Sequence, residues 1–176
     1  MSWSRKMSGS SPFDPVQAAR RLCRRGVGKQ FEGDLDTATT LYERSLEAHE
    51  TAEAWCYLGW CYSLRGHFGI AIAHCRRAIS MEPDFGNPYN DLGAYLVECR
   101  RPDEAIQWFE RAKTAPRYET PQFPYLNLAR VHIRRRQYGP ALLELQAARL
   151  IAPYDERVDE LVDYLGTLVR ALATSA

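Results

Sequence analysis

The side chains that could carry out chemistry in this chain are cysteines, histidines and acids, but their spacing fits no reactive arrangement. Cys56 and Cys61 are five positions apart and Cys75 follows His74, so the pairwise spacings that hold zinc are missing. Serine, histidine and aspartate occur without the context of an activated nucleophile. Residues 26–29 (Gly-Val-Gly-Lys) lack the spacing of a phosphate-binding loop. The sequence therefore predicts no catalysis, no metal and no cofactor.

The cysteines predict a reducing compartment. There are five of them, an odd number without a regular spacing, so they do not form a disulfide framework. We expect five free thiols, mostly buried as small apolar side chains. Residues 1–12 are rich in serine and have no apolar core, so they predict no signal peptide, and no segment approaches the 18 apolar residues of a membrane helix. The expected location is cytoplasmic.

Composition narrows the class of partner. The chain has 176 residues, of which 45% are hydrophobic and 26% charged, as in a globular domain with its own core. Its formal net charge of +1 gives no general attraction to nucleic acid or to anionic membranes. The one basic cluster is too small for a nucleic-acid-binding face; it comprises Arg130, Arg134, Arg135 and Arg136.

The elements that must position these side chains are pairs of helices. One such pair is marked by apolar and small residues at fixed spacing, followed by a helix-ending proline: Trp55, Leu58, Gly59, Tyr62, Ala71, Ala78 and Pro83. Glycine lets the first helix approach the second closely, and Ala71 offers the matching small surface. Related spacings begin near Ala19, Ala52, Gly86 and Gln122. We therefore predict a flexible segment at 1–14, four helix pairs within 15–155 and a last helix at 156–176.

The last helix is amphipathic and is predicted to cover the end of the core. Asp155 can cap its first turn. Apolar residues follow at spacings of three and four, namely Val158, Leu161, Val162, Leu165, Leu168, Val169 and Leu172. A terminal pair without such a cover would expose its apolar face.

The spaced residues from Ala19 to Pro153 resemble the tetratricopeptide repeat family. The resemblance implies an all-α, right-handed α-solenoid of four helix pairs with a capping helix, acting as a non-catalytic adaptor for proteins or peptides. Residues 84–96 followed by 115–118 (Ala-Pro-Arg-Tyr) are similar to small bacterial members of the family. A similar lengthened third repeat occurs in lipoproteins that assist type IV pilus assembly. The longer loop at 115–121 is either a tolerated insertion or a border of the groove.

Family members hold their partners in a concave groove lined by the first helix of each pair. The corresponding candidates here are Tyr57, Trp60, Asn87, Asn90, Asp91, Phe123, Asn127, Arg130 and Arg134. Asparagine can bridge the backbone of a bound segment, aromatic rings supply contact area, and the arginines can meet acidic side chains. For Trp60, packing between helices is an equal alternative. The residues that clamp a terminal carboxylate in one subclass are replaced here by Cys23, Val27, Tyr57, Asn87 and Asp91.

Two functions are favoured by the sequence, and an enzyme accessory that binds a metal or a nucleotide is a third and least favoured one. The first is an adaptor that binds a protein segment in its groove and is itself a monomer. The alternative is a structural subunit of a larger assembly, docked or oligomerised through the capping helix or the convex face, for example in a pilus-assembly-like role. Asp91 would repel a carboxylate, so a co-adaptor of chaperone tails is excluded.

Overall fold

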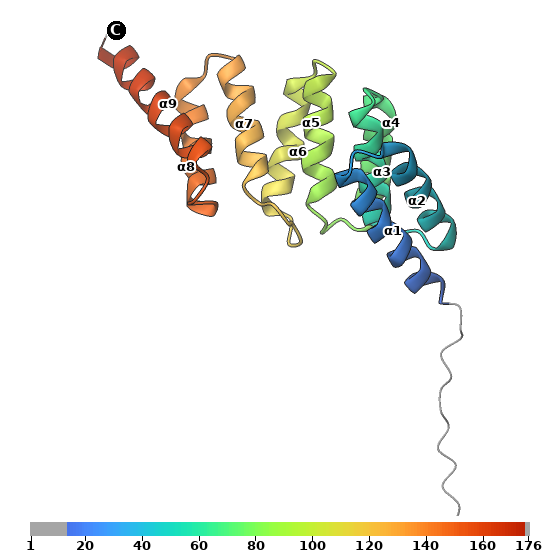
Figure 1. The fold of residues 1–176 in the computed structure, drawn as a ribbon. Coiled ribbons are helices and arrows are strands. Elements are labelled where there is room, and N and C mark those ends of the chain that lie inside the picture. The colour runs from blue at the N-terminus through green and yellow to red at the C-terminus, as the bar shows by residue number, and fades with distance from the viewer. Residues whose placement is uncertain (1–13, 175–176) are drawn as a thin grey trace, which may run out of the picture.

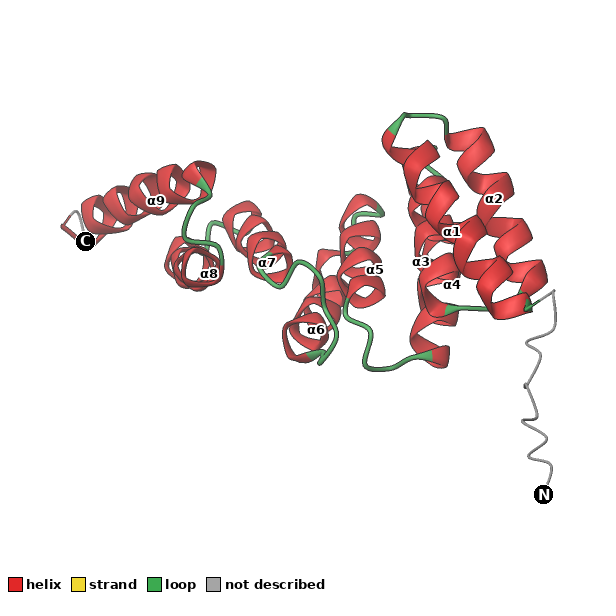
Figure 2. Cartoon of the chain, turned by 60° about the horizontal axis from the view of Figure 1, so that its bottom comes forward, coloured by secondary structure: helices red, strands yellow, loops and turns green. Residues whose placement is uncertain are grey.

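The computed structural model describes residues 14–174, and the regular structure of this part of the chain is helical (Figures 1 and 2). The helices are α1 (Pro15–Phe31), α2 (Leu35–Ala48), α3 (Ala52–Leu64), α4 (Phe68–Met81), α5 (Asn87–Glu98), α6 (Pro102–Thr114), α7 (Phe123–Arg134), α8 (Tyr138–Ile151) and α9 (Glu156–Thr174). The first eight pack as four consecutive pairs, and α9 packs on α8. This arrangement confirms the predicted α-solenoid. The predicted flexible segment lies outside the described residues, apart from Asp14.

Short polar side chains and prolines begin many of these helices. Asp14, Asp34 and Thr51 each accept a hydrogen bond from a backbone N–H in the first turn of the helix that follows. Asp155 does the same for α9, accepting from the backbone N–H of Arg157 at 3.2 Å, as predicted. Proline occupies the first turn of α1, α5, α6 and α7, where no N–H is needed.

The turn inside each helix pair contains one residue in the left-handed conformation. These residues are Gly33 (φ 81°), Gly66 (φ 79°), Arg100 (φ 58°) and Arg136 (φ 59°). Glycine adopts this conformation without steric cost, whereas arginine does not. The sequence showed no turn signal near Gln137, because the residue that makes this turn is an arginine.

Replacing Arg136 with glycine is expected to raise the free energy of unfolding by about 0.5–1 kcal/mol. The substitution removes the strain of an arginine in the left-handed conformation. The greater conformational entropy of glycine in the unfolded chain offsets part of this gain. Urea unfolding followed by circular dichroism measures the change. The control is Gln107→Gly in the exposed middle of α6, which should instead lose about 0.5–1 kcal/mol. A loss of stability in Arg136→Gly would contradict the assigned turn.

Within each pair, a small residue on the first helix lets a larger one on the second come close. A methyl group built at Gly93 would lie 2.6 Å from the Phe109 ring, and one at Gly26 would lie 2.6 Å from the Tyr42 ring. In the fourth pair, Ala129 and Leu145 are buried in one cluster. Glycine is thus paired with an aromatic ring, and alanine with the smaller leucine.

In the second pair, the two helices also approach closely at a glycine, but the glycine faces backbone atoms instead of a ring. A methyl group at Gly59 would lie 3.2 Å from the Ala71 carbonyl oxygen and 3.3 Å from Cβ of His74. Cys75, where the other pairs carry a larger side chain, is fully buried beside Ala71. The predicted close contact between Gly59 and Ala71 is therefore confirmed.

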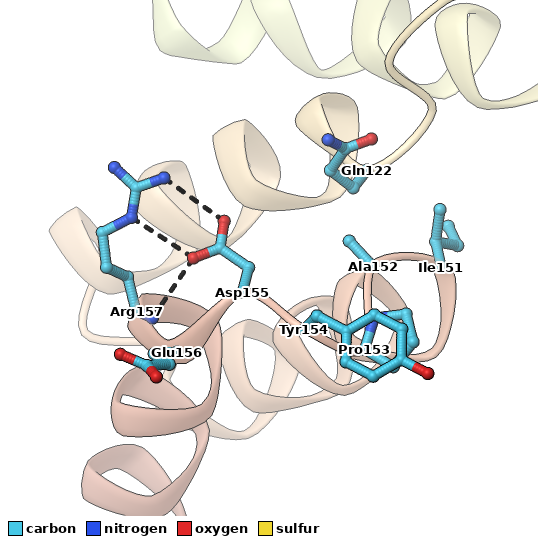
Figure 3. A pocket seen from close by; sticks show the side chains of 8 residues that line it. All are labelled: Gln122, Ile151, Ala152, Pro153, Tyr154, Asp155, Glu156 and Arg157. Atoms are coloured by element: carbon cyan, nitrogen blue, oxygen red, sulfur yellow. Dashed lines mark hydrogen bonds and ion pairs between the residues drawn. The ribbon is translucent and has the colours of Figure 1, made fainter.

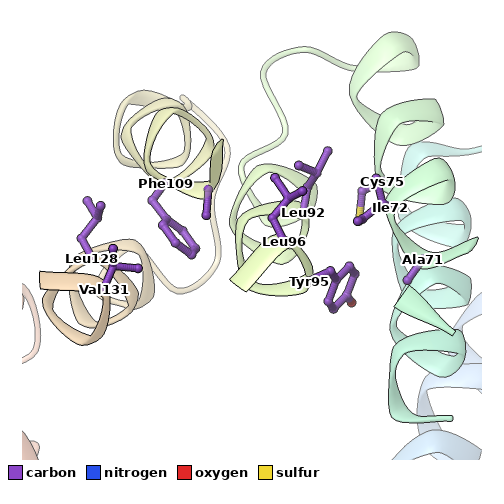
Figure 4. Packing of buried hydrophobic residues seen from close by; sticks show 10 residues of the cluster. Ala71, Ile72, Cys75, Leu92, Tyr95, Leu96, Phe109, Leu128 and Val131 are labelled. Atoms are coloured by element: carbon purple, nitrogen blue, oxygen red, sulfur yellow. The ribbon is translucent and has the colours of Figure 1, made fainter. Parts of the chain in front are cut away.

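The core includes clusters that join one pair to the next. Figure 4 shows buried side chains from α4, α5, α6 and α7 facing one another, including Ile72, Leu96, Phe109 and Val131. Cys75 is buried in this cluster, whereas Cys56 and Cys61 on α3 are buried in neighbouring clusters. Each pair therefore completes the core of its neighbours, as expected for a stacked repeat.

The first helices of the pairs form the inner side of the solenoid. Each of α1, α3 and α5 contacts the next first helix along the chain, whereas the second helices do not contact one another. The first helices are therefore closer together, so they line the concave face. Between Asp14 and Thr174, none of the helices combines the length and apolar character needed to cross a membrane.

The capping helix covers less of the core than its sequence predicts. Val158, Val162 and Leu165 are buried against α8, but Leu161 is 43% exposed and Leu172 is 49% exposed. The prediction of a wide buried stripe was wrong for these two residues. The reason is that α9 contacts α8 but does not reach α7. A gap therefore remains between α7 and α9 on the concave side.

Candidate functional site

The concave face has a polar centre whose side chains already bond to one another. The Asn127 side-chain amide donates to Oδ1 of the Asn90 side chain at 2.9 Å, linking α7 to α5. Asn90 is only 8% exposed, whereas Asn127 is half-buried. The structure thus brings together the two asparagines expected to hold a partner's backbone. Asn127 is the more accessible of the two.

Asp91 lies beside Asn90 and turns toward α3 rather than toward solvent. Its carboxylate accepts a hydrogen bond from the Cys56 thiol at 3.5 Å. Burial raises the pKa of Asp91 to about 6 and also raises the pKa of the Cys56 thiol. The thiol therefore stays protonated and can donate. Asp91 contributes a weak acid to the floor of the groove.

Replacing Asp91 with asparagine is expected to stabilise the protein above pH 6 and to have little effect near pH 4. The raised pKa means that the folded state binds the proton more tightly than the unfolded state, so the contribution of Asp91 to stability falls as pH rises from about 4 to 6. We expect a gain of about 1–3 kcal/mol at pH 7.5. Thermal melts across this pH range measure it. Asp84→Asn, which removes an exposed carboxylate, is the control.

The N-terminal half of the groove carries exposed aromatic area. Trp60 is 38% exposed and meets the edge of Phe31, which is 78% exposed, at a ring separation of 6.3 Å. Tyr57 stacks on Tyr42 at 5.8 Å and is half-buried. Trp60 is therefore not enclosed between helices, which favours its availability to a partner.

The loop at 115–121 folds back onto the second helix pair and borders the groove. The Gly86 N–H donates to the Arg117 carbonyl oxygen at 2.7 Å, and the Arg117 N–H donates to the Asp84 carbonyl oxygen at 3.0 Å. The Arg117 guanidinium pairs with Glu53 and Glu82. The insertion is thus both a brace between repeats and an edge of the groove.

This loop also forms hydrogen bonds with the side chain of Asn87. The Asn87 side-chain amide donates to the Glu119 carboxylate at 3.3 Å, and the Glu119 backbone N–H donates to Oδ1 of Asn87 at 3.5 Å. The sequence assigned Asn87 to partner binding. In the structure, its side chain bonds to Glu119 of the loop, so Glu119 lies beside this candidate.

The C-terminal half of the groove is a cleft of about 480 Å³ between α5, α7, α8 and α9. Its predicted members are Asn90, Phe123, Asn127 and Arg130. Its other lining residues are Leu126, Ala129, Ile133, Leu145, Asp155, Arg157, Val158 and Leu161. The cleft lies between α7 and α9 because these two helices do not contact each other. Sequence reasoning missed the contribution of α9, because apolar residues such as Leu161 were assigned to the core.

Two arginines stand along this cleft on successive turns of α7. Arg130 and Arg134 are exposed and share a small hollow of about 90 Å³ with Glu98. Within residues 14–174, neither arginine forms an ion pair, whereas the neighbouring Arg135 pairs with Asp103. The two guanidinium groups are therefore available to carboxylates from outside the chain.

The turn between α8 and α9 fixes a third cation near the cleft. Figure 3 shows the Asp155 carboxylate facing Arg157, whose Nε lies 3.2 Å from Oδ1. This pairing lowers the pKa of Asp155. A wide, shallow hollow of about 860 Å³ surrounds this turn, with Gln122 and Tyr154 at its border. Asp155 thus both caps α9 and partly neutralises Arg157.

His74 and Cys75 have packing roles in the described structure. His74 lies against the rings of Trp55 and Tyr62, at 5.1 and 5.3 Å, and burial lowers its pKa. Cys75 is fully buried. Across residues 14–174, no three His, Cys, Asp or Glu side chains come together in an arrangement that could hold a metal ion. These side chains are placed to fill space.

Comparison with known proteins agrees with the helix pairs. The tetratricopeptide repeat profile matches residues 52–85, which contain α3 and α4. Over 109 residues, the chain is 32% identical to the cell division cycle protein 27 homolog of Caenorhabditis elegans. That match covers 61% of this chain but only 13% of the length of the relative.

Solved structures share the fold at low sequence identity. The Pseudomonas aeruginosa PilF structure has a TM-score of 0.82 at 19% identity, covering 89% of this chain and 71% of that one. PilW, described as a type IV pilus biogenesis factor, has a TM-score of 0.72 at 24% identity, covering 85% and 72%. The second repeat domain of RPAP3, bound to an HSP90 peptide, has a TM-score of 0.54 at 23% identity, covering 57% and 94%. The profile match identifies residues 52–85 as a tetratricopeptide repeat, and the neighbours share the stacked helix-pair fold of the described chain.

Proposed function

We propose that this protein is a non-catalytic adaptor that binds an extended segment of another protein in its concave groove. The bound segment carries acidic side chains and at least one apolar anchor. It lies along α7, with the anchor in the cleft between α7 and α9 and its carboxylates on Arg130 and Arg134. The cytoplasm, which keeps thiols reduced, is the proposed location.

The observation that carries this proposal is the combination of apolar walls and available cations in one cleft. Phe123 is 44% exposed and Leu161 is 43% exposed, so each has apolar area to cover. Arg130 lines the same cleft and also the adjoining hollow that holds Arg134. Buried apolar contacts supply affinity, and arginine pairs select an acidic partner. The peptide-bound RPAP3 neighbour shows that this fold accommodates a peptide ligand.

Reversing the two arginines is expected to weaken partner binding by about 2 kcal/mol or more, roughly thirtyfold. The wild-type protein captures partners from native extract, and the segment identified by mass spectrometry is then titrated by fluorescence anisotropy. Arg130→Glu with Arg134→Glu should lose binding and keep the melting curve. Affinity of the wild type should also fall as salt rises.

The matched control lies at the other end of the groove. Arg20 and Arg24 are also exposed, four residues apart on a first helix, and line a hollow of about 400 Å³ with Tyr57. Arg20→Glu with Arg24→Glu makes the same change in net charge and should keep most of the affinity. Equal affinity of the Arg130/Arg134 variant and the wild type would refute the proposed groove.

The second candidate function, a structural subunit docked through the convex side, is favoured by apolar side chains on and after α8. Leu143 is 67% exposed, Leu150 84% and Tyr154 96%. Leu143 and Leu150 are seven residues apart and so lie on one face of α8. Exposed apolar surface is typical of protein contacts. Leu150→Ser with Tyr154→Ser should release the partner in this case while leaving the groove intact. A pilus-assembly-like role would be one form of this function.

A further inference from the structure

The N-terminal end of the solenoid carries positive charge where the other repeats are apolar. Counted from the repeat starts, the seventh position holds Leu58, Leu92 and Leu128, which are at most 3% exposed. The same position in the first repeat is Arg25, which is exposed. Four residues earlier, Arg21 stands where the second repeat has the fully buried Ala54. The end face is thus closed to a further apolar repeat.

This end face is nevertheless a groove with a partly apolar floor. An open hollow of about 540 Å³ lies between α1 and α2. Leu22 and Ala48 contribute apolar atoms, and the cationic side chains are Arg21, Arg25 and Arg44, with Glu47 beside them. Among the described residues, none of these four charged side chains forms an ion pair. The groove is therefore suited to an acidic helix that also offers apolar or aromatic atoms.

The opposite end of the molecule offers such a helix. Spacings of four and three place Glu156, Glu160 and Asp163 on the side of α9 that points away from the buried Val162. All three acids are exposed, and in the described part of the chain none of them is paired. Tyr164, beside them, is 69% exposed. Figures 1 and 2 place α1 and α9 at opposite ends of the solenoid.

We propose that copies of this protein associate head to tail, with the outer face of α9 from one copy lying in the α1/α2 groove of the next. Glu160 and Asp163 meet Arg21 and Arg25, and Tyr164 covers the apolar floor. The two surfaces differ, so the contact is heterologous and does not close on itself as a symmetric dimer does. The product is a chain of copies whose concave grooves stay open.

Charge swapping in the full-length protein tests this contact. One variant carries Arg21→Glu and Arg25→Glu, and the other carries Glu160→Arg and Asp163→Arg. Sedimentation velocity is run at low and high salt, because screening shortens the reach of these charges from tens of Å to a few Å. Arg20→Glu with Arg24→Glu, on the groove side of the same helix, is the matched control.

The wild type and the control should form larger species with rising concentration at low salt and return to monomers at high salt. Each swapped variant alone should stay monomeric, because its two ends carry the same sign of charge. Mixing the two variants should restore association, since one junction in the mixture is the native one. Melting curves verify that each variant folds, and neutral versions with serine at the same positions should show weakened association. A monomeric wild type at low salt, or association that survives either swap, would overturn the proposal.

Discussion

Gly93→Leu is expected to lower the free energy of unfolding by about 4 kcal/mol or more, which is at the upper end for overpacking. Even a single added carbon at this position would lie 2.6–2.9 Å from the Phe109 ring. Phe109 is fully buried and cannot move away without disturbing the third pair. Urea unfolding measures the loss. Gly69→Leu is the control, because a side chain there meets nothing within 4 Å and should change stability little.

The fourth pair supplies a rescue for the same contact. Ala129 and Leu145 occupy the places of Gly93 and Phe109 and are both buried. Gly93→Ala and Phe109→Leu should each destabilise the protein, the first by overlap and the second by leaving a cavity. Together they should cost less than the sum of the two, with a coupling of about 1 kcal/mol or more. Strict additivity would show that the two side chains do not limit each other.

Val162→Asp is expected to cost about 3–5 kcal/mol and to detach α9 from α8. Val162 is 5% exposed and packs with Val158 and Leu165 against the last helix pair. A carboxylate at this position would be buried without a partner. Hydrogen exchange should show loss of protection in α8 and α9 while α3 to α6 keep theirs.

The control for this prediction comes from the same helix. Leu172→Asp places the same charge at a position that is 49% exposed, so it should cost less than about 1 kcal/mol. Unchanged protection of α8 in Val162→Asp would mean that α9 does not cap the core.

The helix pairs were predictable because their signals are local. Gly59, Ala71 and Pro83 each act within one pair, and a repeated spacing multiplies the signal. Pro102 marks the turn at Arg100 in the sequence, but the turn at Arg136 has no glycine or proline beside it, since a left-handed arginine leaves no trace in composition. The path of α9 also escaped detection, because amphipathic spacing marks an apolar face but not how much of it a neighbouring helix covers.

The positions of the groove residues were predictable from the sequence, but their hydrogen-bond partners were less so. All nine candidates lie on first helices, as expected. What Asn87 and Asn90 bond to depends on residues more than thirty positions away, in the loop and in α7. Those contacts depend on how the pairs stack on one another, and the sequence of a single repeat does not determine that stacking. Within residues 14–174, Arg130 and Arg134 form no ion pair, so both remain candidates for binding a partner.

The brace at Arg117 alters how this protein is expected to unfold. In a stacked repeat, contacts join neighbours along the chain, and each unit can fray in turn from either end. The ion pair from Arg117 to Glu53 spans 64 positions and crosses from the end of the third pair to the start of the second. These two pairs should therefore open together, as one cooperative block, with the outer pairs fraying first. The lengthened loop would then join the second and third helix pairs into a single folding unit within the stacked repeat.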